Sequence, residues 1–179
     1  MKKTKALTIS HVVCFVGISG KSDDRGPIKP LSEETLSGKI ISSVEAKLRT
    51  VSECPMFFRD NLVRNPPLCA GKLRYPTLRE MKAEWALFER RLAKTKSNVV
   101  VLLGALVADF FRDRRRIRTF LCPSADGLLL KWVGVDENGL IILAVAHPSY
   151  VGVYARKRLG EYAEIILQAI KGLPINKGP

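Results

Sequence analysis

A histidine near the carboxyl end of the sequence stands where an apolar run stops. Residues 143–146 read Leu-Ala-Val-Ala, and His147, Pro148 and Ser149 follow them directly. A short apolar run of this kind predicts a buried strand, which would deliver His147 to the edge of a sheet. The alternative is that His147 merely ends a strand, so its interpretation depends on which other residues the chain places beside it.

Two further polar segments follow predicted strands. Residues 17–24 read Gly-Ile-Ser-Gly-Lys-Ser-Asp-Asp and come after the strand predicted over residues 11–16. A glycine-containing loop after a strand exposes backbone N–H groups and can approach an anion closely. Asn61 lies close to the end of the strand predicted over residues 56–63, where a polar amide needs a specific partner. A side-chain amide donates and accepts at once, so it can pair with the edge of a base.

Alternating strands and helices position these three segments. Strands are predicted over residues 11–16, 56–63, 98–103, 128–135 and 140–146, and helices over 38–51, from Thr77 onward, 104–112 and 154–172. Thr77 and Glu80 form a capping box, and Asn138-Gly139 suits a tight hairpin turn between the last two strands. Residues 25–37 and 119–127 are expected to be irregular. This order predicts a mainly parallel sheet with helices on both faces, and ligands bind beyond the carboxyl ends of such strands.

The composition favours one globular domain over residues 1–179 that binds a polyanion. The chain has 30 Lys plus Arg against 17 Asp plus Glu, a formal net charge of +13. Neutralising phosphates releases condensed counterions, so nucleic acid is the expected partner. An acidic membrane is the competing partner, but it would prefer a basic amphipathic helix or a lipid signal, and the sequence has neither. No transmembrane run is apparent, and we expect a monomer.

The amino-terminal stretch looks like a signal peptide only at first glance. His11 interrupts its apolar run, and no small-residue cleavage site precedes Cys14. We therefore expect a cytoplasmic protein. The sequence has four cysteines without a Cys-x-x-Cys pair: Cys14, Cys54, Cys69 and Cys122. Free thiols are expected in a reducing compartment, and no cofactor or metal is predicted.

A phosphate-binding loop is the first candidate for the residues 17–24 segment, because Gly20-Lys21-Ser22 follows a strand. The full pattern needs a glycine five residues before Gly20, and Phe15 occupies that position. No acidic residue ends the residues 98–103 strand to hold magnesium. This interpretation is therefore rejected.

Several short motifs, none of them specific alone, share an order and spacing that point to one family. They are Val16-Gly17-Ile18-Ser19-Gly20, Pro30-Leu31, Gly38-Lys39, Asn61-Leu62-Val63-Arg64, the residues 100–104 strand end and His147-Pro148-Ser149. In this arrangement the chain resembles the uracil-DNA glycosylase superfamily from about residue 11 to residue 170. The resemblance implies a three-layer α/β/α sandwich with a mainly parallel central sheet.

The resemblance also implies an activity, namely a DNA glycosylase that flips a base out of the stack and hydrolyses its N-glycosidic bond. His147 would stabilise the negative charge on the departing base, and Asn61 would read the base edge. The remaining base-binding candidates are Gly17, Ile18, Ser19, Leu31 and Phe58. The DNA-binding candidates are Lys21, Ser149, Tyr150, Arg156, Lys157 and Arg158, with Tyr150 a candidate wedge.

The chain departs from the family at two positions. Ile18 stands where several branches carry Asp, Asn or Glu to position the attacking water. Asp23, which we favour, and Asp24 are the nearest carboxylates for that role; the alternative is that both are solvated loop residues. Leu31 stands where an aromatic residue usually stacks on the base, which suggests a roomier pocket or a different base, and Phe57 or Phe58 could stack instead.

The substrate therefore stays open at this point. Uracil is the family default, and a modified pyrimidine is the alternative, including the bulky modified cytosines of phage DNA, which would make the protein a defence enzyme rather than a repair enzyme. A third hypothesis is a DNA-binding relative without catalysis. Some members hold an iron–sulfur cluster through four cysteines that begin with a close pair; this chain lacks that pair, so no cluster is expected.

One basic segment, an arginine run, matches none of the family motifs. It contains Arg112, Arg114, Arg115, Arg116 and Arg118. A helix that starts at the carboxyl edge of a sheet ends near the opposite edge, so these residues are expected away from the site. They are either a solvated or protein-contacting face, or a contact to the DNA backbone.

Overall fold

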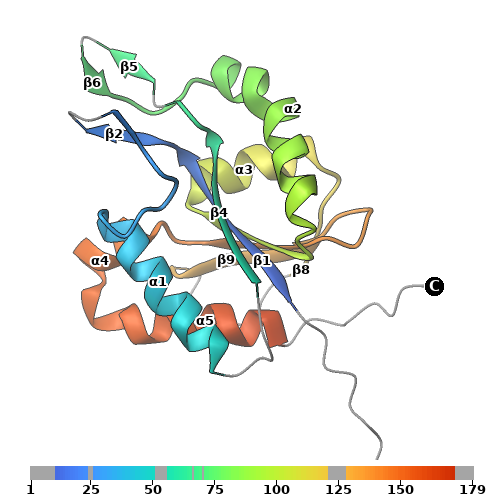
Figure 1. Ribbon diagram of the computed structural model, residues 1–179. Coiled ribbons are helices and arrows are strands. Elements are labelled where there is room, and N and C mark those ends of the chain that lie inside the picture. Colours follow the sequence, from blue (N-terminus) through green and yellow to red (C-terminus); the bar gives the residue numbers. More distant parts are fainter. Residues whose placement is uncertain are drawn as a thin grey trace, which may run out of the picture.

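The computed structural model describes residues 11–23, 26–50, 56–65, 67–69, 71–120 and 128–171. At its centre lies a sheet with helices on either side (Figure 1). The sheet has six strands in the order β4-β1-β7-β10-β9-β8. These strands are β1 (Val12–Ser19), β4 (Met56–Val63), β7 (Val99–Leu103), β8 (Arg118–Phe120), β9 (Leu130–Val135) and β10 (Ile141–Val145). β4, β1, β7 and β10 run parallel, and β9 and β8 extend the sheet through antiparallel pairs.

Helices cover both faces of this sheet. One face carries α1 (Leu36–Arg49), α4 (Pro148–Tyr154) and α5 (Leu159–Lys171), and the other carries α2 (Leu78–Thr95) and α3 (Ala105–Arg114) (Figure 1). The predicted three-layer α/β/α sandwich with a mainly parallel sheet is therefore confirmed. Within the described ranges, no helix has both the length and the apolar character that crossing a bilayer requires.

Strand alternation divides the core between the two faces. Val13 and Phe15 of β1 pack in the cluster under α1 and α5, and Cys14 and Val16 pack in the cluster under α2 and α3. Successive side chains of a strand point to opposite faces, so a fully apolar strand is what a sheet covered on both sides needs. Burial raises the pKa of the Cys14 thiol to about 12, so this cysteine is a packing residue.

The start of α2 bears out the predicted capping box. The Glu80 N–H donates to Thr77 Oγ1 at 3.3 Å, and the Thr77 N–H donates to Glu80 Oε2 at 2.7 Å. Two backbone donors at the helix start are thereby satisfied. The hairpin predicted around Asn138-Gly139 is confirmed as well, with Gly139 at a φ of 80°.

The carboxyl-terminal helix differs from its prediction over residues 154–172. A separate helix, α4, begins at Pro148, and a 3-10 turn, η1 (Arg156–Arg158), separates it from α5. Residues 148–154 include Pro, Gly and β-branched Val, so their helix propensity is low. Gly152 lies against α1, where an added Cβ would come within 2.9 Å of Ile40. Close packing on α1 therefore supports a helix that local sequence does not favour.

Three short pairings were not predicted. β2 (Lys21–Asp23) pairs with β3 (Gly26–Ile28), and β8 lies at the start of the second segment expected to be irregular. β5 (Leu68–Cys69) pairs with β6 (Lys72–Leu73). Strands of two or three residues are too short to show a hydrophobic period, so the pattern could not reveal them.

Candidate active site

A small cavity opens at the carboxyl ends of β1, β4 and β10, where the three polar segments meet. Its volume is about 40 Å³, which is room for about three water molecules. The lining residues are Gly17, Ile18, Ser19, Ile28, Lys29, Leu31, Thr35, Ser37, Asn61 and His147. The structure thus brings Gly17, Asn61 and His147 to one place, as the parallel-sheet argument predicts.

Asn61 lies directly across from Gly17 in the β1–β4 pair. A Cβ atom at Gly17 would collide with Asn61 Oδ1, so only glycine leaves room for this amide. The Asn61 backbone is fixed on both sides, because its N–H donates to Asp60 Oδ1 at 2.9 Å and its carbonyl accepts from Arg91 Nη2 at 2.8 Å. Within the described part of the chain its side-chain amide makes no hydrogen bond, which leaves the amide for a ligand.

His147 is the N-cap residue of α4. Its Nδ1 accepts from the Ser149 N–H at 3.3 Å and lies 2.7 Å from Ser149 Oγ. A backbone N–H can only donate, so Nδ1 carries no proton, and the neutral ring carries its proton on Nε2. The cap therefore turns His147 into a neutral hydrogen-bond donor through Nε2.

Neighbouring elements fix the position of His147. The Tyr162 hydroxyl of α5 donates to the Ala146 carbonyl at 2.8 Å, and the Ala146 N–H donates to the Leu129 carbonyl at 2.7 Å. Full burial raises the pKa of Tyr162, so its hydroxyl stays protonated and donates. Gly104, at a φ of 104°, packs beside the imidazole, and a Cβ there would come within 3.3 Å of His147 Cβ. The end of β10 is therefore rigidly held on three sides.

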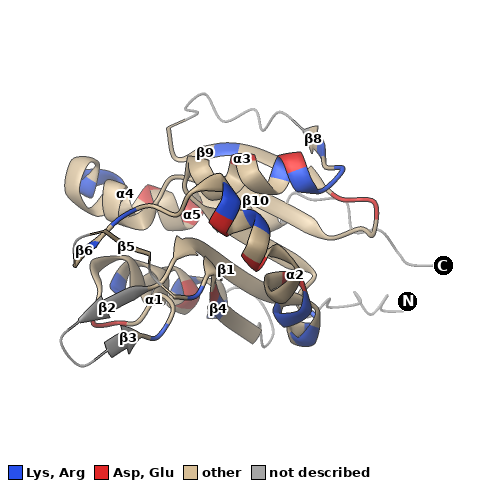
Figure 2. Ribbon diagram, turned by 90° about the horizontal axis from the view of Figure 1, so that it is seen from above, with Lys and Arg blue, Asp and Glu red and all other residues tan. Residues whose placement is uncertain are grey.

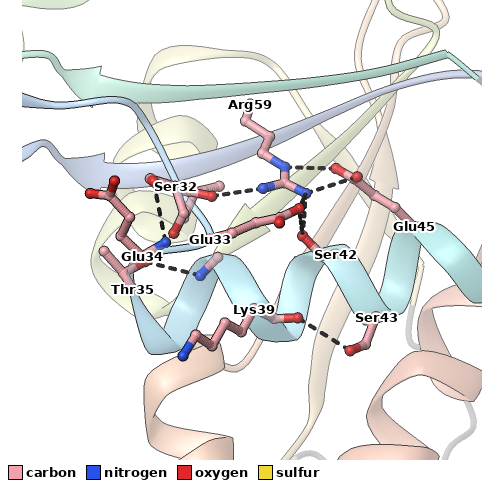
Figure 3. Close-up of polar contacts among 11 residues, drawn as sticks. Ser32, Glu33, Glu34, Thr35, Lys39, Ser42, Ser43, Glu45 and Arg59 are labelled. Atoms are coloured by element: carbon pink, nitrogen blue, oxygen red, sulfur yellow. Dashed lines mark hydrogen bonds and ion pairs between the residues drawn. The ribbon is translucent and has the colours of Figure 1, made fainter.

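Arg59 of β4 holds the loop that carries Leu31 against α1 (Figure 3). Leu31 has a φ of 50°, a left-handed conformation that is unfavourable for leucine, and its carbonyl accepts from Arg59 Nη1 at 2.8 Å. The same guanidinium donates to both carboxylate oxygens of Glu45, each at 2.8 Å, and to Ser42 Oγ at 2.8 Å. These bonds compensate for the backbone strain at the cavity wall.

Replacing Arg59 with methionine should lower the free energy of unfolding by about 1–3 kcal/mol, because Glu45 and the Leu31 carbonyl lose their donor. Arg59→Lys should recover only part of this loss, since an ammonium group cannot serve the three acceptors with fork geometry. Lys39→Met, an exposed change on α1, the helix that carries Glu45, is the control and should stay within about 0.5 kcal/mol. Urea denaturation measures all three; equal stability of Arg59→Met and the control would contradict this account.

The other predicted base-binding residues differ in their placement. Ile18 lines the cavity at the end of β1, yet it is buried and packs in the core under α2 and α3. Phe58 does not line the cavity and packs against the same core. The period of two along β4 places Phe57 and Asn61 on one face and Phe58 on the other, so Phe58 is poorly placed to stack on a base beside Asn61.

The assignment of Asp23 or Asp24 to the positioning of the attacking water stays a prediction. Asp23 ends β2, which follows β1 after Gly20, and Asp24 lies outside the described residues. Lys21 begins the same short strand. The lining residues given above include no carboxylate, so within the described residues the polar side chains of the cavity are an amide, hydroxyls, an imidazole and the ammonium group of Lys29.

Exposed aromatic and basic side chains follow His147 along α4 and η1. Tyr150 and Tyr154 are exposed and pack against each other with ring centroids 5.3 Å apart. Arg156 and Lys157 are exposed, whereas Arg158 pairs with Glu161 at 2.6 Å. Figure 2 shows basic residues at this end of the molecule and again near α3 and β8. Arg156 and Lys157 are therefore better placed than Arg158 to meet a phosphate.

The arginine run lies at the opposite edge of the sheet, as predicted. Arg115 donates to Asp136 at 2.6 Å and to Glu89 at 2.9 Å. Asp136 lies in the turn before β10, at the amino end of that strand, whereas the cavity lies beyond its carboxyl end. Arg112 pairs with Asp109 at 3.3 Å. At least two of these arginines thus have structural partners.

Sequence reasoning missed the residues that the first turn of α1 brings to the cavity. Thr35 caps α1, which begins at Leu36, two residues before the predicted helix start at residue 38, and Ser37 lies within its first turn. Thr followed by an apolar residue was the available signal for an earlier helix start. The structure describes Cys14 and Cys69 as free thiols, and within its described ranges no group of three or more His, Cys, Asp or Glu could hold a metal ion.

Comparison with known families agrees with this geometry. The sequence model of the uracil DNA glycosylase superfamily matches residues 35–171. This match covers more than half of the chain and includes Asn61 and His147, so the chain belongs to the uracil DNA glycosylase superfamily. The Gly17 to Ser19 segment lies before the matched range, and the structure places it beside Asn61. No curated protein matches the chain.

Proposed function

We propose that this protein is a monofunctional DNA glycosylase that flips a pyrimidine out of DNA and hydrolyses its bond to deoxyribose, as a monomer and without a metal or other cofactor. One observation carries the proposal: the Asn61 amide and the His147 imidazole line the same small cavity at the carboxyl edge of the sheet. Both groups suit the recognition and departure of a base.

The two side chains have different tasks in the proposed reaction. Breaking an N-glycosidic bond develops positive charge on the sugar and negative charge on the departing base. The His147 Nε2–H donates to an oxygen of that base and stabilises its charge in a pocket that holds little water. The Asn61 amide donates to and accepts from the base edge, which orients the base before the bond breaks.

Uracil is the proposed substrate. Uracil is the default base of the superfamily to which the chain belongs, and its keto and N–H edge matches the donors and acceptors that Asn61 and His147 bring to this cavity. Glycine at position 17 and leucine at position 31 bound this space without an aromatic side chain. Leu31 would contact the base face through an aliphatic side chain, where many family members stack an aromatic ring.

Contacts to DNA are proposed for residues beside the cavity. Arg156 and Lys157 would pair with phosphates that flank the flipped nucleotide, Ser149 would contact the opened strand, and Tyr150 would fill the space the base leaves. The net charge of +13 supports binding to a polyanion. Repair of deaminated DNA is the role that this substrate implies.

A substrate panel tests the proposed function. End-labelled duplexes and single strands carrying uracil, hypoxanthine, hydroxymethylcytosine or only normal bases are incubated with the protein in EDTA and then cleaved with alkali. We expect cleavage at uracil. Strands that stay intact with every substrate would refute the proposed glycosylase activity. Salt-dependent binding without product would instead indicate a DNA-binding relative, and cleavage at hydroxymethylcytosine alone would favour the defence hypothesis.

The water-positioning role of Asp23 has its own test. Asp23→Asn should lower the single-turnover rate of excision by about 10²–10⁴, because the amide cannot accept the proton of the attacking water. Asp24→Asn is the matched control and should stay close to the wild-type rate. Quenched-flow measurement of base release compares the two. If Asp24→Asn lowers the excision rate and Asp23→Asn does not, Asp24 positions the water. If both variants excise at the wild-type rate, neither aspartate does.

A further inference from the structure

Ser37 holds a buried hydroxyl that has no hydrogen-bond partner among the residues that the structure describes. The residue lies in the first turn of α1, lines the cavity and is 3% exposed. Among the described residues, its Oγ makes no hydrogen bond and is closed to solvent. A buried hydroxyl without a partner destabilises a fold, and most buried polar groups are therefore paired. Local packing does not explain why a hydroxyl-bearing residue occupies this buried position.

The neighbouring hydroxyl in the same turn is fully used. Thr35 Oγ1 accepts from the Gly38 N–H at 3.1 Å and donates to the Ser32 carbonyl at 2.8 Å. Gly38 lies so close to the Ser32 carbonyl that a Cβ atom there would collide with it. The backbone around Ser37 is thus fixed by Thr35 and Gly38, and the Ser37 hydroxyl is not needed for the local fold.

The start of α1 favours a negatively charged ligand. Aligned peptide dipoles place partial positive charge at a helix amino terminus, and α1 has 14 residues. Ser37 and His147 line the same cavity as Asn61. A hydroxyl can donate its proton to an oxygen that carries negative charge, and such hydrogen bonds are stronger than neutral ones.

We propose that the Ser37 hydroxyl donates a hydrogen bond to a ring keto oxygen of the flipped base and stabilises the charge that this oxygen gains as the base leaves. The inference rests on the proposed glycosylase function and names its substrate class more closely: a pyrimidine with a keto oxygen turned toward the first turn of α1. Ser37 then acts on the leaving base together with His147, and its unpaired state without substrate is the cost of that role.

The first test compares Ser37→Ala with the wild type on a uracil duplex. We expect the single-turnover rate to fall by about 10- to 100-fold, the range for a hydrogen bond to a charged group. We also expect Tm to rise by about 2–4 °C, because the variant removes an unpaired buried hydroxyl. Ser43→Ala, an exposed serine of the same helix, is the matched control and should change neither value. A slower Ser37→Ala with a lower Tm would overturn the inference, since the hydroxyl would then be structural.

The second test replaces one keto oxygen of uracil at a time with sulfur, a weaker hydrogen-bond acceptor. Sulfur should slow the wild type at each oxygen that His147, Asn61 or Ser37 contacts, and Ser37→Ala should reduce this penalty for one of the two monothio analogues only. Equal sulfur effects in both proteins would overturn the role of Ser37 while leaving the glycosylase in place. A wild type inactive on every uracil substrate would overturn the proposed function and this inference with it.

Discussion

Replacing His147 with alanine is expected to lower the single-turnover rate of base excision by about 10²–10³, the usual cost of losing one donor to a developing anion. The Nδ1 atom accepts from the Ser149 N–H, so the neutral ring donates only through Nε2. Without the ring, the departing base loses this donor in a cavity with little room for water to replace it. Binding to uracil-containing DNA should change far less than the rate, because the charge develops only as the bond breaks.

The control for this prediction has to preserve the start of α4. His147 is the N-cap of that helix, and alanine is a poor cap, so His147→Ala also loses about 1 kcal/mol of stability. His147→Asn restores a good cap but does not place an imidazole Nε2–H in the cavity. We expect it to match the wild type in thermal unfolding and the alanine variant in rate. Wild-type turnover by His147→Asn would remove His147 from the mechanism.

The sequence could predict the strands and their meeting point for a physical reason. β1, β7 and β10 are continuous apolar runs because helices bury both faces of the sheet, and such runs are visible without any structure. Parallel strands also end at the same edge, so the sequence alone could place Gly17, Asn61 and His147 together, and in the structure they line one cavity. Here the local pattern and the tertiary fold agree, as they must for the chain to fold uniquely.

The parts that escaped prediction depend on partners far away in sequence. Arg59 and Arg91 look like ordinary strand and helix charges, and only the folded chain shows that they bind the backbone beside the cavity. Ser37 is similar: a serine in a first helical turn is common, and only the folded chain shows that its hydroxyl has no hydrogen-bond partner among the described residues. The start of α4 was missed because packing on α1 compensates for weak local propensity.

Arg91→Met is expected to lower the free energy of unfolding by about 3–5 kcal/mol, the largest stability effect that we predict. Arg91 of α2 donates from Nε to Asp60 Oδ2 at 2.7 Å and from Nη2 to the Asn61 carbonyl at 2.8 Å. The Asp60 side chain is only 11% exposed, so losing Arg91 leaves a carboxylate in the interior. Arg64, at 3.5 Å and mostly exposed, is a weak substitute.

Two further variants separate the buried charge from the arginine's other contacts. Arg90→Met changes the neighbouring exposed residue of α2 and should stay within about 0.5 kcal/mol in urea denaturation. The double variant Asp60→Asn with Arg91→Met should recover part of the loss, because it removes the unpaired charge. The unrecovered part measures the other contacts of Arg91, namely its bonds to the Asn61 and Leu62 carbonyls and its packing on the Phe88 ring. We expect this part to be accompanied by slower excision, since the two carbonyl bonds fix the strand end that carries the base-reading amide. A double variant as unstable as Arg91→Met alone would show that the Asp60 charge is not the cause.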